Sequence, residues 1–379
     1  MGNGTFSSTA YESAKTAHGA DKGRPVTERA EQKARETGKL HPLVDPRGLP
    51  QYGPVRLSKP RFEQQPNGLW LMTIGTPIPM ETRVDTTGSM GGNVDVAMEV
   101  LPKAFELVTQ MLPGCDLQVA TGIFGDARAD QFVLCRPQFE MEAHKIVEQL
   151  TLMVPERNGG DTTEDPDYGI FAGAYLTRAY ANRIGLKGYD FTVSDADGRG
   201  GVGVSKLLAV FGEDVFERMA EIGHKIDRKK LPDTKQIVQD LLTRAHAFFL
   251  QVGNDSTTRR FWTDVYGADR VVALPDTRFL PHVQATIVGL TEGTLGLSDV
   301  AGFLKKNGMS QADAGRVAKS VANIPIGAQA ALPNYSRRPK AGDLFKTKED
   351  LWPLTPEELS ELAPEAVSAE PEEGKVDWL

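Results

Sequence analysis

The residues best suited to chemistry lie in one short stretch, where a carboxylate and two hydroxyl groups alternate with other side chains. Asp85, Thr87 and Ser89 occupy every second position, and Gly88 lies between the two hydroxyls. Side chains two residues apart point the same way in an extended or tightly looped backbone, so these three can converge where a strand ends. Three oxygen ligands, only one of them charged, suit a hard cation such as Mg²⁺ and leave coordination positions for water. The alternative is an ordinary Ser/Thr turn that caps the helix predicted to follow.

This arrangement of strand, hydroxyl loop and apolar-striped helix resembles the metal-ion-dependent adhesion site (MIDAS) of the von Willebrand factor type A (vWA) domain family, whose pattern is Asp-x-Ser/Thr-x-Ser. The resemblance implies two further ligands from loops that are distant in the sequence. The first loop follows Gly159 and Gly160 and offers Asp161, Thr162 and Thr163, which we rank in that order. A glycine turn into a capped helix would give a similar pattern.

The second loop follows a hydrophobic strand predicted over residues 189–194. The resemblance assigns the ligand position there to Asp195, with Asp197 as the alternative, because the family has Thr/Ser-Asp-Gly after such a strand. The Gly-Gly-Asp-x-x-Glu-Asp form of the first loop is similar to a branch of vWA domains that includes those attached to alpha-kinases. The predicted metal ligands are therefore Asp85, Thr87, Ser89, Asp161, Thr162 and Asp195.

The surrounding elements predict an α/β fold with a doubly wound, mostly parallel sheet flanked by helices. Residues 94–112 carry apolar side chains three and four apart and predict a helix, whereas the alternation over residues 117–124 predicts a strand. In open sheets of this kind the site lies at the carboxyl ends of the strands, where the acidic loops fall. The other predicted elements are helices at 27–39, 140–153, 168–181, 205–245 with a break near 230–232, 278–290, 297–304 and 311–324, and strands at 132–135, 247–253 and 270–274.

The strand that leads to Asp85 fits this scheme least well. Residues 80–84 are mostly polar, and the apolar run at 69–74 lies farther upstream. Pro77 and Pro79 interrupt the interval, and proline disfavours the interior of a central strand. We therefore expect either an extra strand at 69–74 followed by a short one before Asp85, or an unusual topology.

Composition divides the chain into four parts. Residues 1–60 lack an apolar period and predict a flexible or partner-ordered arm. Residues 61–292 form the vWA-like domain, with a helical insertion at about 205–236, and residues 293–332 form a small helical appendage. Residues 333–379 are a Pro-rich and finally acidic tail. Because the arm is more basic than acidic, the two ends are candidates for joining subunits into a homo-oligomer.

Composition also narrows the classes of function. The net charge of −8 disfavours nucleic-acid binding, and no apolar run is long enough to span a membrane. Two cysteines, Cys115 and Cys135, indicate a reducing compartment, so we expect a cytoplasmic location. The histidines form no close pair that would suggest zinc, and His246 is expected in the core. The glycine-rich stretch at 198–203 lacks the lysine of a phosphate-binding loop.

Two classes of function remain. In the first, the resemblance implies a bound Mg²⁺, with Mn²⁺ and Ca²⁺ as alternatives, whose open coordination position takes a carboxylate from a partner protein. Such a module would act as an adaptor in a larger intracellular assembly, and the family suggests an AAA+ ATPase as the partner. In the second, a Mg²⁺-dependent hydrolase or phosphotransferase would use Asp85 as its nucleophile, although Thr87 stands where such enzymes usually carry a second acid. A purely structural assembly subunit is a further alternative. We expect a binding module and not an enzyme.

Overall fold

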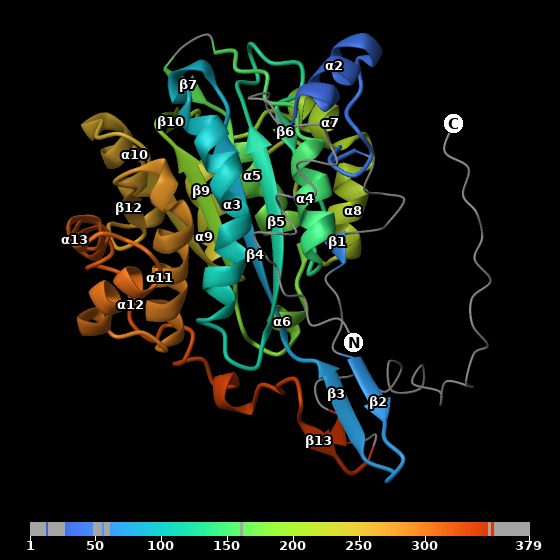
Figure 1. The fold of residues 1–379 in the computed structure, drawn as a ribbon. Coiled ribbons are helices and arrows are strands. Elements are labelled where there is room, and N and C mark those ends of the chain that lie inside the picture. Colours follow the sequence, from blue (N-terminus) through green and yellow to red (C-terminus); the bar gives the residue numbers. More distant parts are fainter. Residues whose placement is uncertain are drawn as a thin grey trace.

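A central β-sheet lies between two layers of helices (Figure 1). The computed structural model describes residues 13, 27–47, 55–56, 61–159, 162–347 and 350–351 of the 379-residue chain. Within these residues the sheet has six strands in the order β12-β11-β9-β4-β5-β6, and every neighbouring pair is parallel except β5 and β6. The strands are β4 (Pro77–Asp85), β5 (Asp116–Phe124), β6 (Leu134–Cys135), β9 (Gly188–Ser194), β11 (Ala245–Gln251) and β12 (Val271–Ala273). The predicted doubly wound α/β fold is confirmed.

The two faces of the sheet belong to separate hydrophobic clusters, which define the helical layers. Ile78 and Val84 of β4 point into one cluster, and Phe124 and Phe249 point into the other. The first layer contains α3 (Asn93–Thr109), α4 (Ala143–Thr151) and α11 (Leu280–Glu292). The second layer contains α5 (Pro166–Tyr175), α7 (Val204–Phe211), α8 (Val215–Glu221), α9 (Thr234–Leu242) and α10 (Ser256–Tyr266).

Shorter elements extend this framework. The remaining helices are α2 (Glu28–Thr37), α6 (Tyr180–Arg183), α12 (Val300–Lys306) and α13 (Gln311–Ser320). Two short parallel pairs join β1 (Val55–Arg56) to β8 (Thr177–Arg178) and β7 (Thr163–Glu164) to β10 (Asp197–Gly198). A separate antiparallel sheet in the order β13-β3-β2 combines β2 (Arg61–Gln64), β3 (Trp70–Ile74) and β13 (Leu344–Phe345). In the described ranges, no helix combines the length and apolar character that crossing a bilayer requires.

Strand β4 is longer than predicted. The extra strand expected at 69–74 is present as β3, but the expectation of a short strand before the hydroxyl loop was wrong, because β4 is unbroken over nine residues and buried throughout. The N–H of Asp116 in β5 donates to the Thr76 carbonyl at 3.2 Å, so by strand alternation the nitrogens of Pro77 and Pro79 face the opposite side. On that side β9 pairs with β4 only from Met80 onwards. The two prolines therefore remove no hydrogen bond from the sheet.

The polar residues of β4 are buried in an ion-pair network. Arg83 pairs with Asp190 of β9, and its Nη1 lies 3.1 Å from Glu81 Oε1. Arg136 donates two hydrogen bonds of 2.8 Å to the Glu81 carboxylate and one of 2.7 Å to the Thr177 hydroxyl. Burial raises the pKa of Glu81, but the two arginines outweigh it and lower that pKa to about 2. Since a buried charge is tolerated when it is paired and hydrogen-bonded, a central strand can carry these residues.

Two glycines bring helix α5 close to this network. A Cβ atom on Gly169 would overlap Cδ of Arg83 and lie 3.1 Å from its Nε. A Cβ atom on Gly173 would lie 3.1 Å from Asp190 Oδ2. The two glycines are four residues apart and therefore share one face of the helix. Helix α5 thus covers the buried arginine with its backbone.

The N-terminal limit of the domain differs from the predicted one. Residues 27–47 were assigned to the arm, yet Ala34, Leu40 and Val44 are buried in the main cluster. The N–H of Arg136 also donates to the Val44 carbonyl at 2.8 Å. The apolar residues of this segment are few and widely spaced, which is why the sequence did not predict its packing.

The C-terminal limit differs as well. The segment after residue 333 was assigned to the tail, but Arg338 Nη1 pairs with Glu292 Oε2 at 2.8 Å and both side chains are buried. The Thr76 hydroxyl donates to the Pro339 carbonyl at 3.0 Å, and β13 pairs with β3. These contacts are mostly hydrogen bonds and ion pairs, which leave no hydrophobic period in the sequence. Most of the rest of the predicted arm and tail lies outside the described residues.

Replacing Gly169 with alanine should destabilise the protein, because the new methyl group collides with an arginine that cannot move without breaking buried ion pairs. We expect the free energy of unfolding, measured by urea denaturation, to fall by about 2 kcal/mol or more. Gly315→Ala in α13 is the matched control, since no atom lies within 4 Å of the added Cβ. It should leave stability unchanged or raise it by up to about 1 kcal/mol. Equal stabilities of the two variants would contradict the close packing of α5 on Arg83.

Candidate metal centre

Asp85 ends β4 at the carboxyl edge of the sheet and is fully buried. Its Oδ1 accepts hydrogen bonds from the backbone N–H and the hydroxyl of Thr87, at 2.8 and 2.7 Å. Its Oδ2 accepts one from the Ser194 hydroxyl at 2.5 Å. Burial raises the pKa of Asp85 to about 6, and the hydrogen bonds oppose the rise because they stabilise the ionised form. Three donors on its two oxygens suit the ionised form of this buried group.

Ser89 and Asp195 continue the cluster towards solvent. Ser89 Oγ lies 3.3 Å from Thr87 Oγ1 and donates a hydrogen bond of 2.9 Å to Asp195 Oδ1. Ser89 is exposed and Asp195 is half-buried, whereas Asp85 and Thr87 are buried. Adjacent ligands of an octahedral Mg²⁺ lie roughly 3 Å apart, because its bonds to oxygen are about 2.1 Å long. The spacing of these four side chains fits such an ion.

The pairing of β7 with β10 brings the two distant loops together. Thr162 directly precedes β7 and lines the same pocket as Ser89 and Asp195. The hydroxyl of Thr163 accepts a hydrogen bond of 2.7 Å from Arg199 Nη1 instead. The predicted ligands that gather at this edge of the sheet are Asp85, Thr87, Ser89, Thr162 and Asp195, and Asp161 lies outside the described residues.

Glu164 was not among the predicted ligands, yet it lies against the same cluster. Its carboxyl group is buried beside Thr87, and its Oε2 has no hydrogen-bond partner among the described residues. Burial raises the pKa of Glu164 to about 8, and the charges of Asp85 and Asp126 add to the rise. A buried polar atom without a partner is costly, and a cation bound here would remove that cost. In the sequence, Glu164 was visible only as one member of an acidic loop.

Ser194 was also missed by the sequence analysis. Its hydroxyl accepts a hydrogen bond of 3.0 Å from the Ala196 N–H while donating to Asp85. Ser194 therefore fixes both the loop that carries Asp195 and the orientation of the central carboxylate. The Ser-Asp pair could be read in the sequence, but only the parallel pairing of β4 with β9 shows that this serine reaches Asp85.

An acidic pocket of about 440 Å³ adjoins the cluster. It is lined by four carboxylates and four hydroxyls, together with Ala196: Glu164, Asp195, Asp197, Asp255, Ser89, Thr162, Thr257 and Thr258. Asp197, the alternative ligand, has a buried Oδ1 that no described residue hydrogen-bonds. Among the described residues no basic side chain lines the pocket, so the field of its carboxylates favours a cation. Across the described part of the chain, no group of three or more His, Cys, Asp or Glu residues is arranged to hold a metal, so a site here depends on its hydroxyls.

The hydroxyls do not cap the helix that follows them. Helix α3 begins at Asn93, and its N-cap residue, Gly92, has no side chain. The intervening 3₁₀ turn (Gly88–Met90) also has no side-chain cap. Thr87 and Ser89 bond to carboxylates instead, so the alternative of an ordinary capping turn was wrong.

Three loops thus meet at the carboxyl edge of a mainly parallel sheet. The end of β4 and the loop after it supply Asp85 and Ser89, the loop after β9 supplies Asp195, and the segment that leads into β7 supplies Thr162. The sheet and the arrangement of these loops resemble those of a vWA domain. The candidate site has buried oxygen atoms on one side and a pocket open to solvent on the other.

No family model and no curated protein matches the chain. Among solved structures it is similar to proximal thread matrix protein 1 from the mussel byssus, with 10% identity and a TM-score of 0.36, and to the pilus adhesin SpaC from Lactobacillus rhamnosus GG, with 11% and 0.39. A von Willebrand factor type A protein from Catenulispora acidiphila gives 14% and 0.33.

These matches cover 57%, 60% and 59% of this chain, and 46%, 34% and 44% of the matched chains, so this chain spans less than half the length of each. One structure of the mussel protein is described as having a zinc-occupied MIDAS motif. The resemblance to a vWA domain therefore rests on the sheet and the loops of this protein.

Removing the Ser194 hydroxyl should weaken cation binding although no ligand is lost. Ser194→Ala leaves Asp85 Oδ2 without its donor, and loss of such an orienting hydrogen bond typically lowers metal affinity about 10- to 100-fold. Thr257→Ala is the matched control, because that hydroxyl lines the pocket and makes no hydrogen bond to the cluster. Calorimetric titration with Mn²⁺ measures the effect. Unchanged affinity in Ser194→Ala would show that the serine does not orient the site.

Proposed function

We propose that this protein is a metal-dependent protein–protein interaction module. The residues that would hold the ion are Asp85, Thr87, Ser89 and Asp195, with Asp161, Thr162 and Glu164 as further oxygen donors. Mg²⁺ is the proposed ion, and Mn²⁺ and Ca²⁺ are alternatives. The observation that carries the proposal is a buried, hydrogen-bonded carboxylate joined through two hydroxyls to an acidic pocket that opens to solvent.

A carboxylate from a partner protein is the ligand that fits this site best. The hydroxyls are neutral ligands, so a cation held here keeps enough positive charge to attract a further anion. Ser89 is exposed and lies at the pocket, whereas Asp85 is sealed from solvent. A partner can therefore approach only from the side of Ser89 and Asp195.

Binding is favoured over catalysis by the state of Asp85. A nucleophilic carboxylate must reach its substrate, but both oxygens of Asp85 accept hydrogen bonds and the side chain is fully buried. Thr87 occupies the place where phosphotransferases of this kind usually carry a second acid, and its hydroxyl is engaged by Asp85. We therefore propose that the protein is not an enzyme.

The proposed partner is a protein in a larger intracellular assembly, and not nucleic acid, given the net charge of −8. An AAA+ ATPase is the first candidate, on the sequence resemblance alone. The proposed cytoplasmic location is supported by Cys115 and Cys135, which are buried free thiols.

Calorimetric titration of the metal-free protein with Mg²⁺ should reveal one site. Asp85→Asn keeps the shape of the side chain but removes its charge, so we expect the affinity to fall about tenfold or more. Asp264→Asn is the control, because Asp264 is an exposed carboxylate of α10 that pairs with Lys235 away from the pocket. Circular dichroism should show that both variants remain folded. A protein that binds no divalent cation at millimolar concentration would rule out the proposed site.

Partner capture should depend on the ion and on Asp85 together. The immobilised protein, incubated with an extract of its source cells in Mg²⁺, should retain a set of proteins that EDTA releases. Asp85→Asn should lose the same set and Asp264→Asn should keep it, as measured by quantitative mass spectrometry.

A parallel assay with p-nitrophenyl phosphate tests the alternative function, a hydrolase that uses Asp85 as its nucleophile. Turnover that requires Asp85 would overturn the binding proposal in favour of a hydrolase.

A further inference from the structure

The two edges of the central sheet are protected differently. At one edge, β6 is buried, and the segment around Val44 runs beside it and accepts a hydrogen bond from the Arg136 N–H. At the other edge, β12 pairs with β11, and no other described strand lies beside it. The Leu274 N–H donates to the Gln251 carbonyl, so by alternation the backbone groups of Val271 and Ala273 face away from β11. Val271 is buried and Ala273 is partly exposed, so this edge can offer hydrogen bonds to an extended peptide at Ala273.

A groove of about 350 Å³ follows this open edge. Val271, Val272 and Ile324 form an apolar floor, and all three are buried. Helices α10 and α13 form the walls, and Figure 1 shows both helices on the same side of the molecule as β12. The groove therefore offers backbone hydrogen-bonding groups and apolar surface together, which suits an extended peptide better than a small polar ligand.

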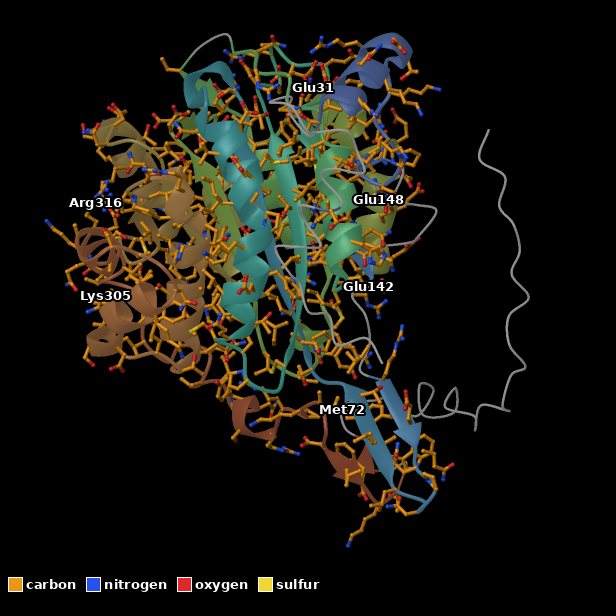
Figure 2. The ribbon with its side chains drawn as sticks, viewed as in Figure 1. Glu31, Met72, Glu142, Glu148, Lys305 and Arg316 are labelled. Carbon is orange, nitrogen blue, oxygen red and sulfur yellow. The ribbon has the colours of Figure 1, made fainter. Side chains whose placement is uncertain are left out.

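The walls of the groove are basic. Arg259, Arg316 and Lys319 line it against a single carboxylate, Asp269. Arg316, which Figure 2 labels at this edge of the molecule, is held by Asp313 at 3.2 Å. Among the described residues, Arg259 and Lys319 are exposed and take part in no ion pair. The groove thus presents unneutralised positive charge, although the whole chain is acidic.

The chain itself contains a segment with the complementary chemistry. Residues 352–379 carry eight acidic residues and one lysine. The last part, residues 372–379, has no proline; in an extended chain Val376 and Trp378 share one face, and Glu373, Lys375 and Asp377 share the other, which ends in Leu379. We propose that the groove binds residues 372–379 of the same chain as an added strand on β12. Val376 and Trp378 would face the apolar floor, and the carboxylates would face the basic walls.

The length of the chain permits this contact. The last described residue, Leu351, is buried against the small antiparallel sheet. The twenty or so residues between it and residue 372 can span up to roughly 70 Å. A globular chain of this size has a radius of gyration of about 21 Å. Because the segment is tethered, its effective concentration at the groove is high, so even a weak strand addition would be populated.

Photo-cross-linking in the full-length protein tests this proposal. With p-benzoylphenylalanine at position 378, cross-links should map to β12 and α13, and every cross-linked pair should lie within one chain. Arg259→Glu combined with Lys319→Glu should lower the yield about fivefold, since each exposed ion pair contributes little. Lys305→Glu is the matched control: Lys305 is exposed on α12, outside the groove, and its reversal should leave the yield unchanged. Added salt should also lower the yield.

Reversing the charges of residues 372–379 is a second test of the proposal, and it does not alter the folded domain. Glu373→Lys with Asp377→Lys should lower the yield as the groove variants do, and combining both sets of changes should restore it. Cross-links that fall outside the groove, or a yield that neither reversal changes, would overturn the proposal. Mixing isotopically light and heavy protein identifies the source of the segment. Cross-links formed only between different chains would overturn the assignment to the same chain.

Discussion

The structure of the site depends on keeping one carboxylate charged inside the protein. Asp85 lies out of water at the end of a central strand, and hydrogen bonds from Thr87 and Ser194 satisfy its two oxygens. Thr87 follows β4 and Ser194 is the last residue of β9, so the two strand ends must lie side by side before the charge is tolerated. The contact between Ser89 and Asp195 then follows from the same pairing, and the solvent-exposed side of the cluster becomes the pocket.

The scaffold beneath and around the site also relies on buried charge. Arg83 and its partners tie β4 to β9, and α5 can cover them only because it carries glycines where they touch. Around the loops, Arg157 joins Glu31 of α2 to Asp95 of α3 at 3.3 and 2.8 Å, in a left-handed backbone conformation. The next residue, Asn158, accepts a hydrogen bond of 2.9 Å from the Gly88 N–H. The segment assigned to a flexible arm therefore supports the loop that carries the ligands.

Features that depend on residues close together in the sequence could be predicted. Asp85, Thr87 and Ser89 share a two-residue spacing, and the helices and strands around them have clear periods, so the fold and the grouping of these side chains at one edge of the sheet could be predicted. The positions of buried polar side chains could not be predicted where their partners lie far away in the sequence. The polar residues of β4 argued against a long central strand, because Asp190, more than a hundred positions away, is what makes Arg83 tolerable there. Glu164 was missed for the same reason, since its place beside Thr87 follows from the pairing of β7 with β10.

Anomalous diffraction from crystals of the protein grown with Mn²⁺ tests the central claim most directly, because it locates the ion without reference to affinity or partner. The account predicts one strong peak among the side-chain oxygens of Thr87, Ser89 and Asp195, at about 2.2 Å from its nearest ligands. It also predicts that the peak is lost in Asp85→Asn crystals while the sheet is unchanged. A peak elsewhere, or none at this cluster, would contradict the assignment of these loops as a metal centre.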